Sequence, residues 1–318
     1  MQDQSLDSIT FHNVPDDCRA IVTDWYAGRI AAIDTDGARS VHLPHPQGGG
    51  RVLKLKGAGL DGGPVQFGAF HRSGPKAPVF DFDGRMMDDI ASGHDGAFRG
   101  GASFQQASTE YRVAQRLQER GYAPIPCLGY GRIEKAGFVS WFSLFEYPPG
   151  LSKDMMYPRL PLEKWIALNI EIGALMVDLA VKHDLIGYCW YSQLPDGQCL
   201  IRDLHPFRFA DPFNMSQISW VMQLFYALHI RGNTQRLNAP KWAADPGMPP
   251  DLHVWQYRCV APNVTLADHD ALRHEIVVPY MLNPPDATFS VERLAATLKG
   301  NPITAGLMAA CPPQFARF

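Results

Sequence analysis

The sequence predicts an α+β fold with a sheet-rich first half and a mainly helical second half. Up to about residue 55, short apolar runs alternate with glycine turns, which is typical of an antiparallel sheet. One predicted helix follows, and then two strand-like runs over 125–133 and 138–146. Beyond residue 150, apolar residues recur at spacings of three and four, which indicates helices.

Residues 19–55 are predicted to form a small antiparallel meander. Its apolar runs are Ala20–Val22, Ile30–Ile33 and Val52–Leu53, and the Gly48–Gly50 triplet marks a turn.

The segment Leu53-Lys54-Leu55-Lys56-Gly57-Ala58-Gly59 indicates a strand that leads directly into a glycine turn. Alternation places Lys54 and Lys56 on one face of the strand and the two leucines on the other. A lysine at the strand's end, followed by Gly57 and Gly59, can meet a polyphosphate. No complete G-x-x-x-x-G-K-[ST] motif follows, so the prediction depends on the rest of the chain.

A long segment rich in glycine, proline and aspartate then covers 57–101, either as a functional loop or as a solvated insertion. A helix is predicted over 103–120. The Ser103 hydroxyl can cap it, Gln106 stands in capping-box spacing, and Gly121 ends it. Glu110 lies near the edge of its apolar face, from which it can point into a cleft.

The strands over 125–133 and 138–146 are predicted to form a hairpin, after which proline and glycine force an extended connector up to Gly150. We therefore predict two lobes. Residues 1–150 form the sheet lobe with helix 103–120, and residues 151–318 form the helical lobe.

The second half contains the clearest helix, over 162–184. Further helices are predicted at 215–231, 265–281 and 289–299. A turn at 194–198 precedes a strand that ends on the carboxylate of Asp203.

Composition argues against several classes of protein. The 29 basic and 32 acidic residues give a net charge of -3, so neither nucleic acid nor a membrane surface is an expected partner. The six cysteines are scattered without a CxxC pair, which indicates neither a zinc knuckle nor a disulfide framework. No apolar run is long enough to span a membrane, and we expect a soluble, cytoplasmic protein.

Three ionisable residues follow one another on elements of different kinds. Lys56 ends a strand, Glu110 lies on a helix and Asp203 ends a hairpin. This order is typical of a nucleoside-triphosphate site of the protein-kinase type. There the lysine neutralises phosphate charge, the glutamate holds the lysine and the aspartate holds the metal. Gln193, ten positions before Asp203, is predicted to complete the metal shell.

In such a site the two lobes are joined by a connector. Glu146 and Tyr147 are predicted to form it, with a backbone that can meet the adenine of ATP.

Several segments match a known family: Tyr26-Ala27-Gly28, Leu55–Gly59, Asp83-Gly84-Arg85, Phe98-Arg99 and Ile201–Phe207. Through them the chain resembles the protein-kinase-like superfamily and, within it, the selenoprotein O family of pseudokinase-like AMPylases, over about residues 20–210.

The resemblance implies a two-lobed kinase-like fold that uses ATP and Mg²⁺ to transfer AMP to protein hydroxyls. It also implies an ion pair between Lys56 and Glu110, a magnesium ion on Asp203, and Arg85 or Arg99 in contact with phosphate.

Other interpretations stay open. The transferred group can be phosphoryl, and the acceptor can be a protein or a small molecule. Tyr188 stands where a conventional kinase has its catalytic aspartate, which favours a non-catalytic nucleotide-binding scaffold. The segment Arg202–His205 resembles the ATP-binding segment of siderophore-type synthetases, which would imply an ATP-dependent carboxylate ligase. Lys56 and Glu110 can also be ordinary surface charges.

Overall fold

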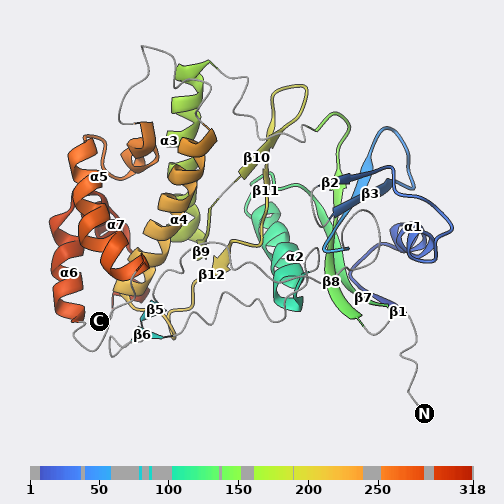
Figure 1. Ribbon diagram of the computed structural model, residues 1–318, viewed down its shortest axis with the longest axis horizontal. Helices are drawn as coiled ribbons and strands as arrows, with labels where there is room; N and C mark the ends of the chain where they lie inside the picture. The colour runs from blue at the N-terminus through green and yellow to red at the C-terminus, as the bar shows by residue number, and fades with distance from the viewer. Residues whose placement is uncertain are drawn as a thin grey trace. The chain divides into compact units, whose positions relative to one another are not determined.

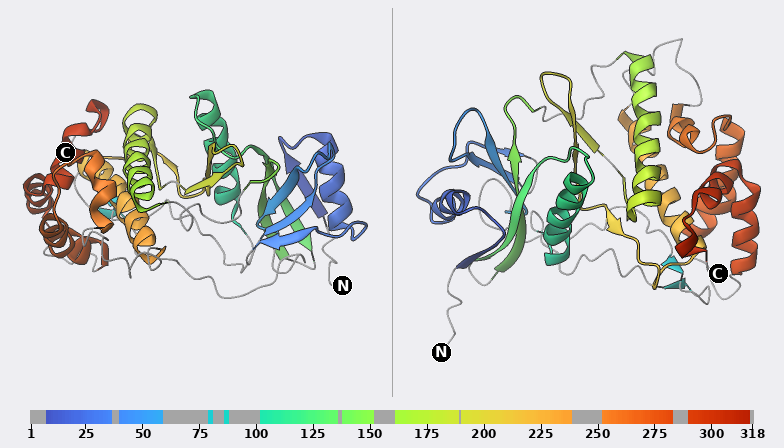
Figure 2. Two further views of the ribbon diagram at one scale, coloured as in Figure 1. Left: turned by 90° about the horizontal axis from the view of Figure 1, so that it is seen from above. Right: turned by 180° about the vertical axis from the view of Figure 1, so that it is seen from behind.

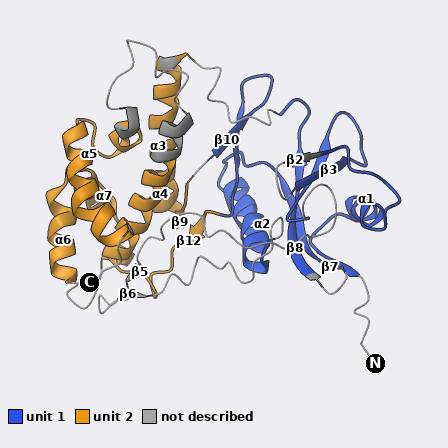
Figure 3. Cartoon of the chain, viewed as in Figure 1, with its two compact units in different colours: residues 1–72, 93–155, 190–205 blue, residues 73–92, 156–189, 206–318 orange. Residues whose placement is uncertain are grey.

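The computed structural model describes the following ranges of the chain: 8–36, 40–58, 79–80, 86–87, 102–135, 138–151, 161–188, 190–238, 252–282 and 290–316. The chain divides into two compact units (Figure 3). Unit 1 comprises residues 1–72, 93–155 and 190–205, and unit 2 comprises residues 73–92, 156–189 and 206–318. Unit 1 is rich in strands and unit 2 is mainly helical, which confirms the predicted α+β class (Figure 1).

The predicted division at residue 150 falls near the change from unit 1 to unit 2 that follows residue 155. Because unit 1 also takes in 190–205, the two-lobe division of the sequence at 150 stays a prediction.

Unit 1 is built on a six-stranded antiparallel sheet with the order β1-β7-β8-β4-β3-β2. Its strands are β1 (Ser8–His12), β2 (Asp34–Asp36), β3 (Ser40–Pro44), β4 (Val52–Lys56), β7 (Cys127–Lys135) and β8 (Phe138–Tyr147). The predicted strand that ends at Lys56 and the β7–β8 hairpin are both confirmed.

The predicted strand at Ala20–Val22 is wrong, because these residues lie in helix α1 (Asp16–Tyr26). The helix buries Cys18, Val22 and Trp25, which are spaced four and three residues apart, as on one face of a helix. A short apolar run inside this pattern resembles a strand when it is read alone.

The expected strand at Ile30–Ile33 is also wrong. This segment is irregular, and the next strand, β2, begins only at Asp34. Ile33 is 62% exposed, so it does not contribute to a buried sheet face.

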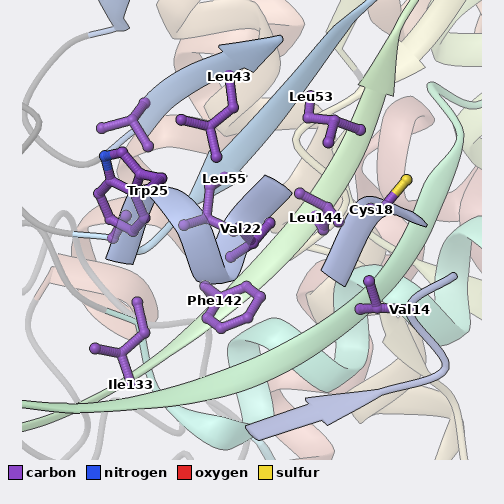
Figure 4. Packing of buried hydrophobic residues seen from close by; sticks show 12 residues of the cluster. Val14, Cys18, Val22, Trp25, Leu43, Leu53, Leu55, Ile133, Phe142 and Leu144 are labelled. Atoms are coloured by element: carbon purple, nitrogen blue, oxygen red, sulfur yellow. The ribbon is translucent and has the colours of Figure 1, made fainter. Parts of the chain in front are cut away.

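One face of the sheet forms the hydrophobic core of unit 1 together with α1 (Figure 4). The buried members of this cluster are Val14, Cys18, Val22, Trp25, Val41, Leu43, Leu53, Leu55, Ala58, Ile133, Phe142 and Leu144. Burying a side chain such as Leu53 or Leu55 contributes about 1.5–3 kcal/mol. Because Leu53 and Leu55 belong to the same cluster as the buried residues of α1, they lie on the sheet face that α1 covers. Side chains alternate along a strand, so Lys54 and Lys56 lie on the opposite face.

Helix α2 (Phe104–Glu119) packs on β7 and β8. It lies on the other side of the sheet from α1 (Figures 1 and 2). The Ser103 side chain accepts a hydrogen bond from the backbone N–H of Gln106, and Gly121 follows the helix with φ 82°, so both predicted ends are confirmed.

A second hairpin completes unit 1. Its strands are β10 (Trp190–Gln193) and β11 (Cys199–Arg202). The backbone of Ile201 joins this hairpin to the segment before β7: Ile201 N donates to Ala123 O, and Ile125 N donates to Ile201 O, both at 2.8 Å. These bonds fix the position of Asp203, which follows β11, within unit 1.

Unit 2 consists mainly of helices. They are α3 (Leu162–His183), α4 (Gln217–Asn238), the 3-10 helix η3 (Leu252–Cys259), α5 (Leu266–Leu272), the π-helix η4 (Arg273–Leu282), α6 (Val291–Gly300), α7 (Pro302–Ala310) and the 3-10 helix η5 (Pro313–Phe315). Its short strands are β5 (Val79–Phe80), β6 (Met86–Met87), β9 (Leu185–Ile186) and β12 (Arg208–Phe209).

The predicted helices near 162–184, 215–231, 265–281 and 289–299 are all present, whereas η3 and α7 were not predicted. Trp165 of α3 packs edge-to-face on Trp255 of η3, with ring centroids 5.3 Å apart. No helix in the described part of the chain is long and apolar enough to cross a membrane.

Candidate functional site

Lys56, the last residue of β4, lies at the centre of a buried ionic cluster within unit 1. Its ammonium donates to Glu110 Oε1 and also to Asp203 Oδ1, the latter at 3.1 Å. The Lys56 side chain is 8% exposed and that of Glu110 is 1% exposed, so neither is an ordinary surface charge. The structure thus brings together the three residues that the sequence placed in one site.

Glu110 reaches the cluster from α2. Its second carboxylate oxygen accepts a hydrogen bond from the Ser143 hydroxyl of β8, and Ser143 pairs with Lys56 across the sheet. Burial opposes ionisation of Glu110, but the positive charge of Lys56 and the contact with His205 outweigh it and lower the pKa to about 2. Glu110 is therefore anionic at neutral pH and holds Lys56 in place.

Asp203 follows β11 in a left-handed backbone conformation, with φ 55°. Its Oδ2 lies 3.5 Å from Arg202 Nε, and its side chain is 27% exposed. Burial works against its ionisation, yet Lys56, Arg202 and His205 together hold the pKa of this carboxyl well below its usual range. Asp203 is thus a partly accessible carboxylate that is charged at neutral pH.

His205 and Ser143 belong to the same cluster, although the sequence did not predict either as a site residue. His205 Nδ1 lies 3.5 Å from Lys56 Nζ and 3.5 Å from Glu110 Oε1. In the sequence, only the position of His205 two residues after Asp203 could have indicated that it belongs to the site. Nothing in the sequence could have indicated this for Ser143.

Asp203 fits a magnesium ion better than it fits a metal held by protein ligands alone. Among the described residues, no group of three or more histidine, cysteine, aspartate or glutamate side chains could hold a metal ion. Mg²⁺ usually keeps several waters and needs one or two carboxylates together with phosphate oxygens. Asp203 could supply the carboxylate of such a site.

Gln193 does not lie beside Asp203, and its predicted role as a second metal ligand is corrected. It pairs with Cys199 at the turn end of the hairpin, whereas Arg202, next to Asp203, pairs with Trp190. These two ends of the hairpin are three residues apart along each strand, which corresponds to about 10 Å. The Gln193 amide donates instead to Gly197 O at 3.2 Å.

Glu146 and Tyr147 are strand residues rather than a connector. Both pair with β4, and the backbone N–H of Glu146 donates to Pro126 O at 2.9 Å. That N–H is therefore already used within the protein and does not meet an adenine here. The Glu146 carboxylate binds Arg51 Nη1 at 2.8 Å and His45 Nε2 at 3.1 Å.

Gly57 has a structural reason to be glycine. Its φ is 101°, and an added Cβ would collide with the backbone oxygen of Trp141. Its own carbonyl accepts a hydrogen bond from the Ser140 hydroxyl at 2.9 Å. Its predicted contact with phosphate stays a prediction. The other predicted phosphate contacts lie outside the described residues: Gly59, Arg85 and Arg99.

Comparison with known proteins yields only remote similarity. No protein family model matches the sequence, and no curated protein matches it. A solved structure of WaaP in complex with acyl carrier protein is similar to 94% of this chain and 99% of that chain, with 13% identity and a TM-score of 0.40. The MAP kinase LmaMPK10 from Leishmania major is similar to 93% of this chain and 86% of that chain, with 12% identity and a TM-score of 0.33. Likeness at this level assigns no activity to the chain.

Proposed function

We propose that the protein is an ATP- and Mg²⁺-dependent transferase of kinase-like fold. The single observation that supports it is the contact of Lys56 with both Glu110 and Asp203. A buried lysine held by a helix glutamate and placed beside a metal-binding aspartate is the arrangement that kinase-type enzymes use to bind a nucleoside triphosphate. These residues come from separate elements, so sequence proximity does not explain why they meet.

Each residue has a distinct part in this proposal. Glu110 fixes Lys56, and the Lys56 ammonium neutralises charge on the phosphates. Asp203 would hold Mg²⁺, which supplies further charge neutralisation to phosphate oxygens when it is bound. His205, in contact with the Lys56–Glu110 pair, positions both partners.

The transferred group is AMP or phosphoryl, and the acceptor is a protein or a small molecule. Transfer of this kind depends on positioning and charge neutralisation more than on a strong general base. The presence of Tyr188 at the usual position of the base is therefore compatible with activity.

A non-catalytic nucleotide-binding scaffold is the second candidate. It is favoured by the register of the β10–β11 hairpin, which leaves Gln193 at the far end from Asp203. In that case the same cluster binds nucleotide without turning it over.

Calorimetric titration with ATP and Mg²⁺, followed by mass spectrometry of the mixture, separates the candidates. We expect binding with consumption of ATP and a covalent change in an acceptor supplied from a cell extract. Binding without consumption would support the scaffold, and no binding would contradict both candidates.

Matched variants locate the site. Lys56→Met should abolish binding, and Asp203→Asn should retain some binding but lose turnover. Lys182→Met is the control, because Lys182 lies in unit 2 and its side chain is 65% exposed. Full activity in a folded Lys56→Met protein would show that the site is misplaced.

A further inference from the structure

Both oxygens of the Asp203 carboxylate lie beside cationic side chains. Oδ1 accepts a hydrogen bond from the Lys56 ammonium at 3.1 Å, and Oδ2 lies 3.5 Å from Arg202 Nε. The two cations come from different strands, because Lys56 ends β4 and Arg202 ends β11. The carboxylate is therefore held from two sides within unit 1.

Each of the two cations is itself held by a buried partner. Lys56 also donates to Glu110, whose side chain is 1% exposed. Arg202 Nη1 donates to the hydroxyl of Ser192 at 3.2 Å, and Ser192 is fully buried. These contacts fix the ammonium and the guanidinium beside Asp203, so both cations stay close to its carboxylate.

The charges of these four ionisable residues offset one another. Lys56 and Arg202 each carry one positive charge, and the carboxylates of Glu110 and Asp203 each carry one negative charge. A divalent cation on Asp203 would be attracted by the carboxylate but repelled by the cations beside it. Charges only a few ångströms apart near a protein surface are incompletely screened by water. Asp203 is 27% exposed and can be reached by an ion, but it is a weak ligand for a free divalent cation.

A polyphosphate changes this balance of charge. Phosphate oxygens are common ligands of Mg²⁺, which combines them with one or two carboxylates and several waters. Their negative charge also offsets the repulsion between the metal ion and the two cations, Lys56 and Arg202. Binding of the metal and binding of the polyphosphate should therefore strengthen each other, and such coupling between two ligands is reciprocal.

We propose that Arg202, together with Lys56, closes the metal site of Asp203 to a free divalent cation, so that the metal binds tightly only in combination with a polyphosphate. Arg202 is then a positioning residue that sets the metal affinity of the site. This inference rests on the proposed function, because it takes Asp203 as the metal ligand and Lys56 as a phosphate contact.

Titration of the full chain with Mn²⁺ tests the role of Arg202, with the free ion followed by electron paramagnetic resonance. Mn²⁺ can replace Mg²⁺ because both ions prefer carboxylate and water oxygens. Without nucleotide the wild type should bind Mn²⁺ weakly. Arg202→Met should bind it about tenfold more tightly, or better, because one nearby repulsive charge is removed. A merely structural role of Arg202 would leave the affinity unchanged or lower it.

Matched variants locate the gain in affinity. Arg202→Lys keeps the positive charge, so its affinity for Mn²⁺ should stay close to that of the wild type. Lys182→Met removes an exposed lysine of unit 2 and should change nothing. Addition of Asp203→Asn to Arg202→Met should abolish the gain, because the carboxylate that would bind the ion is then absent.

Two results would overturn the inference. One is equal affinity for Mn²⁺ in the wild type and in a folded Arg202→Met protein. The other is tight one-to-one binding of free Mn²⁺ by the wild type that is lost in Asp203→Asn, and this measurement stays decisive if Arg202→Met does not fold. Binding of ATP to the wild type in the presence of Mn²⁺ is measured separately. If ATP binds, either result leaves the proposed function standing, whereas the absence of ATP binding would contradict both.

Discussion

Glu110 and Lys56 form a buried ion pair whose two members depend on each other for stability. A buried pair adds little compared with apolar residues, but removal of one partner leaves an uncompensated charge and costs about 3–5 kcal/mol. Lys56→Met should therefore destabilise the protein by about this amount, because Glu110 is 1% exposed and then lacks its main counter-charge. Urea unfolding of the wild type and the variant measures the difference.

The double variant is the control for this prediction. Lys56→Met combined with Glu110→Gln removes both charges, and the Gln side chain can still accept from Ser143. We expect it to be more stable than Lys56→Met alone. Additive losses in the double-mutant cycle would show that the pair is not coupled.

The lowered pKa of Glu110 predicts a loss of stability in acid. The carboxyl has a pKa of about 2 in the folded protein, against an ordinary pKa of 4.5 in the unfolded chain. Between these values the unfolded state binds more protons, so stability is fully present above pH 4.5 and falls as the pH drops towards 2. A difference of this size corresponds to about 3 kcal/mol.

Unfolding by urea at several pH values between 6 and 2.5 tests this prediction. The wild type should lose stability more steeply below pH 4.5 than Glu110→Gln, which carries no titrating carboxyl at this position. Asp203 contributes in the same direction and remains in both proteins. Parallel curves for the two proteins would contradict the assignment.

At the scale of elements, the best sequence predictions were those that depend on local signals. Strand β4 follows from the alternation of leucine and lysine, and α2 follows from the Ser103 cap and the terminal Gly121. Helix α1 was missed because its buried residues Cys18, Val22 and Trp25 are spread over about two turns, and the run Ala20–Val22 alone resembles a strand.

The site shows the same limit. Lys56, Glu110 and Asp203 could be predicted because each stands at a characteristic place on its element. Gln193 could not be placed correctly, because its distance from Asp203 depends on the register of the β10–β11 hairpin. Ser143 enters the cluster only through the pairing of β8 with β4, which no local pattern in the sequence reveals.

The turn after β4 supplies a prediction about an element boundary. Gly57→Ala should cost about 3 kcal/mol, because the positive φ is strained for alanine and the new Cβ meets the Trp141 carbonyl. Gly28 also has a positive φ, 73°, but nothing lies within 4 Å of an added Cβ. Gly28→Ala should therefore cost only about 1–2 kcal/mol.

The difference between the two glycine variants isolates the steric contribution, because both share the strain of a positive φ. Thermal or urea unfolding measures it. Equal losses of stability would show that β8 moves freely to accommodate the methyl group at Gly57.

At the scale of the whole molecule, the ionic cluster is assembled from segments that are far apart in the sequence but belong to one compact unit. Lys56, Glu110, Ser143, Asp203 and His205 all lie in unit 1. Unit 1 is discontinuous, because the 190–205 hairpin is inserted between two helical segments of unit 2. The segment that carries Asp203 and His205 is thus connected at both of its ends to segments of unit 2. Completion of the ionic cluster in unit 1 is therefore linked through the chain to the folding of unit 2.

This division predicts where a bound nucleotide stabilises the protein. A ligand that binds only the folded form contributes about 2.7 kcal/mol at a concentration one hundred times its Kd. Local opening follows cooperative units, so this stabilisation should appear mainly in unit 1. In hydrogen exchange with saturating ATP and Mg²⁺, amides of β4, α2, β8 and the β10–β11 hairpin should exchange more slowly, while those of α6 and α7 should not change. The Lys56→Met protein should lose the protection of unit 1. Protection confined to unit 2 would place the nucleotide away from Lys56.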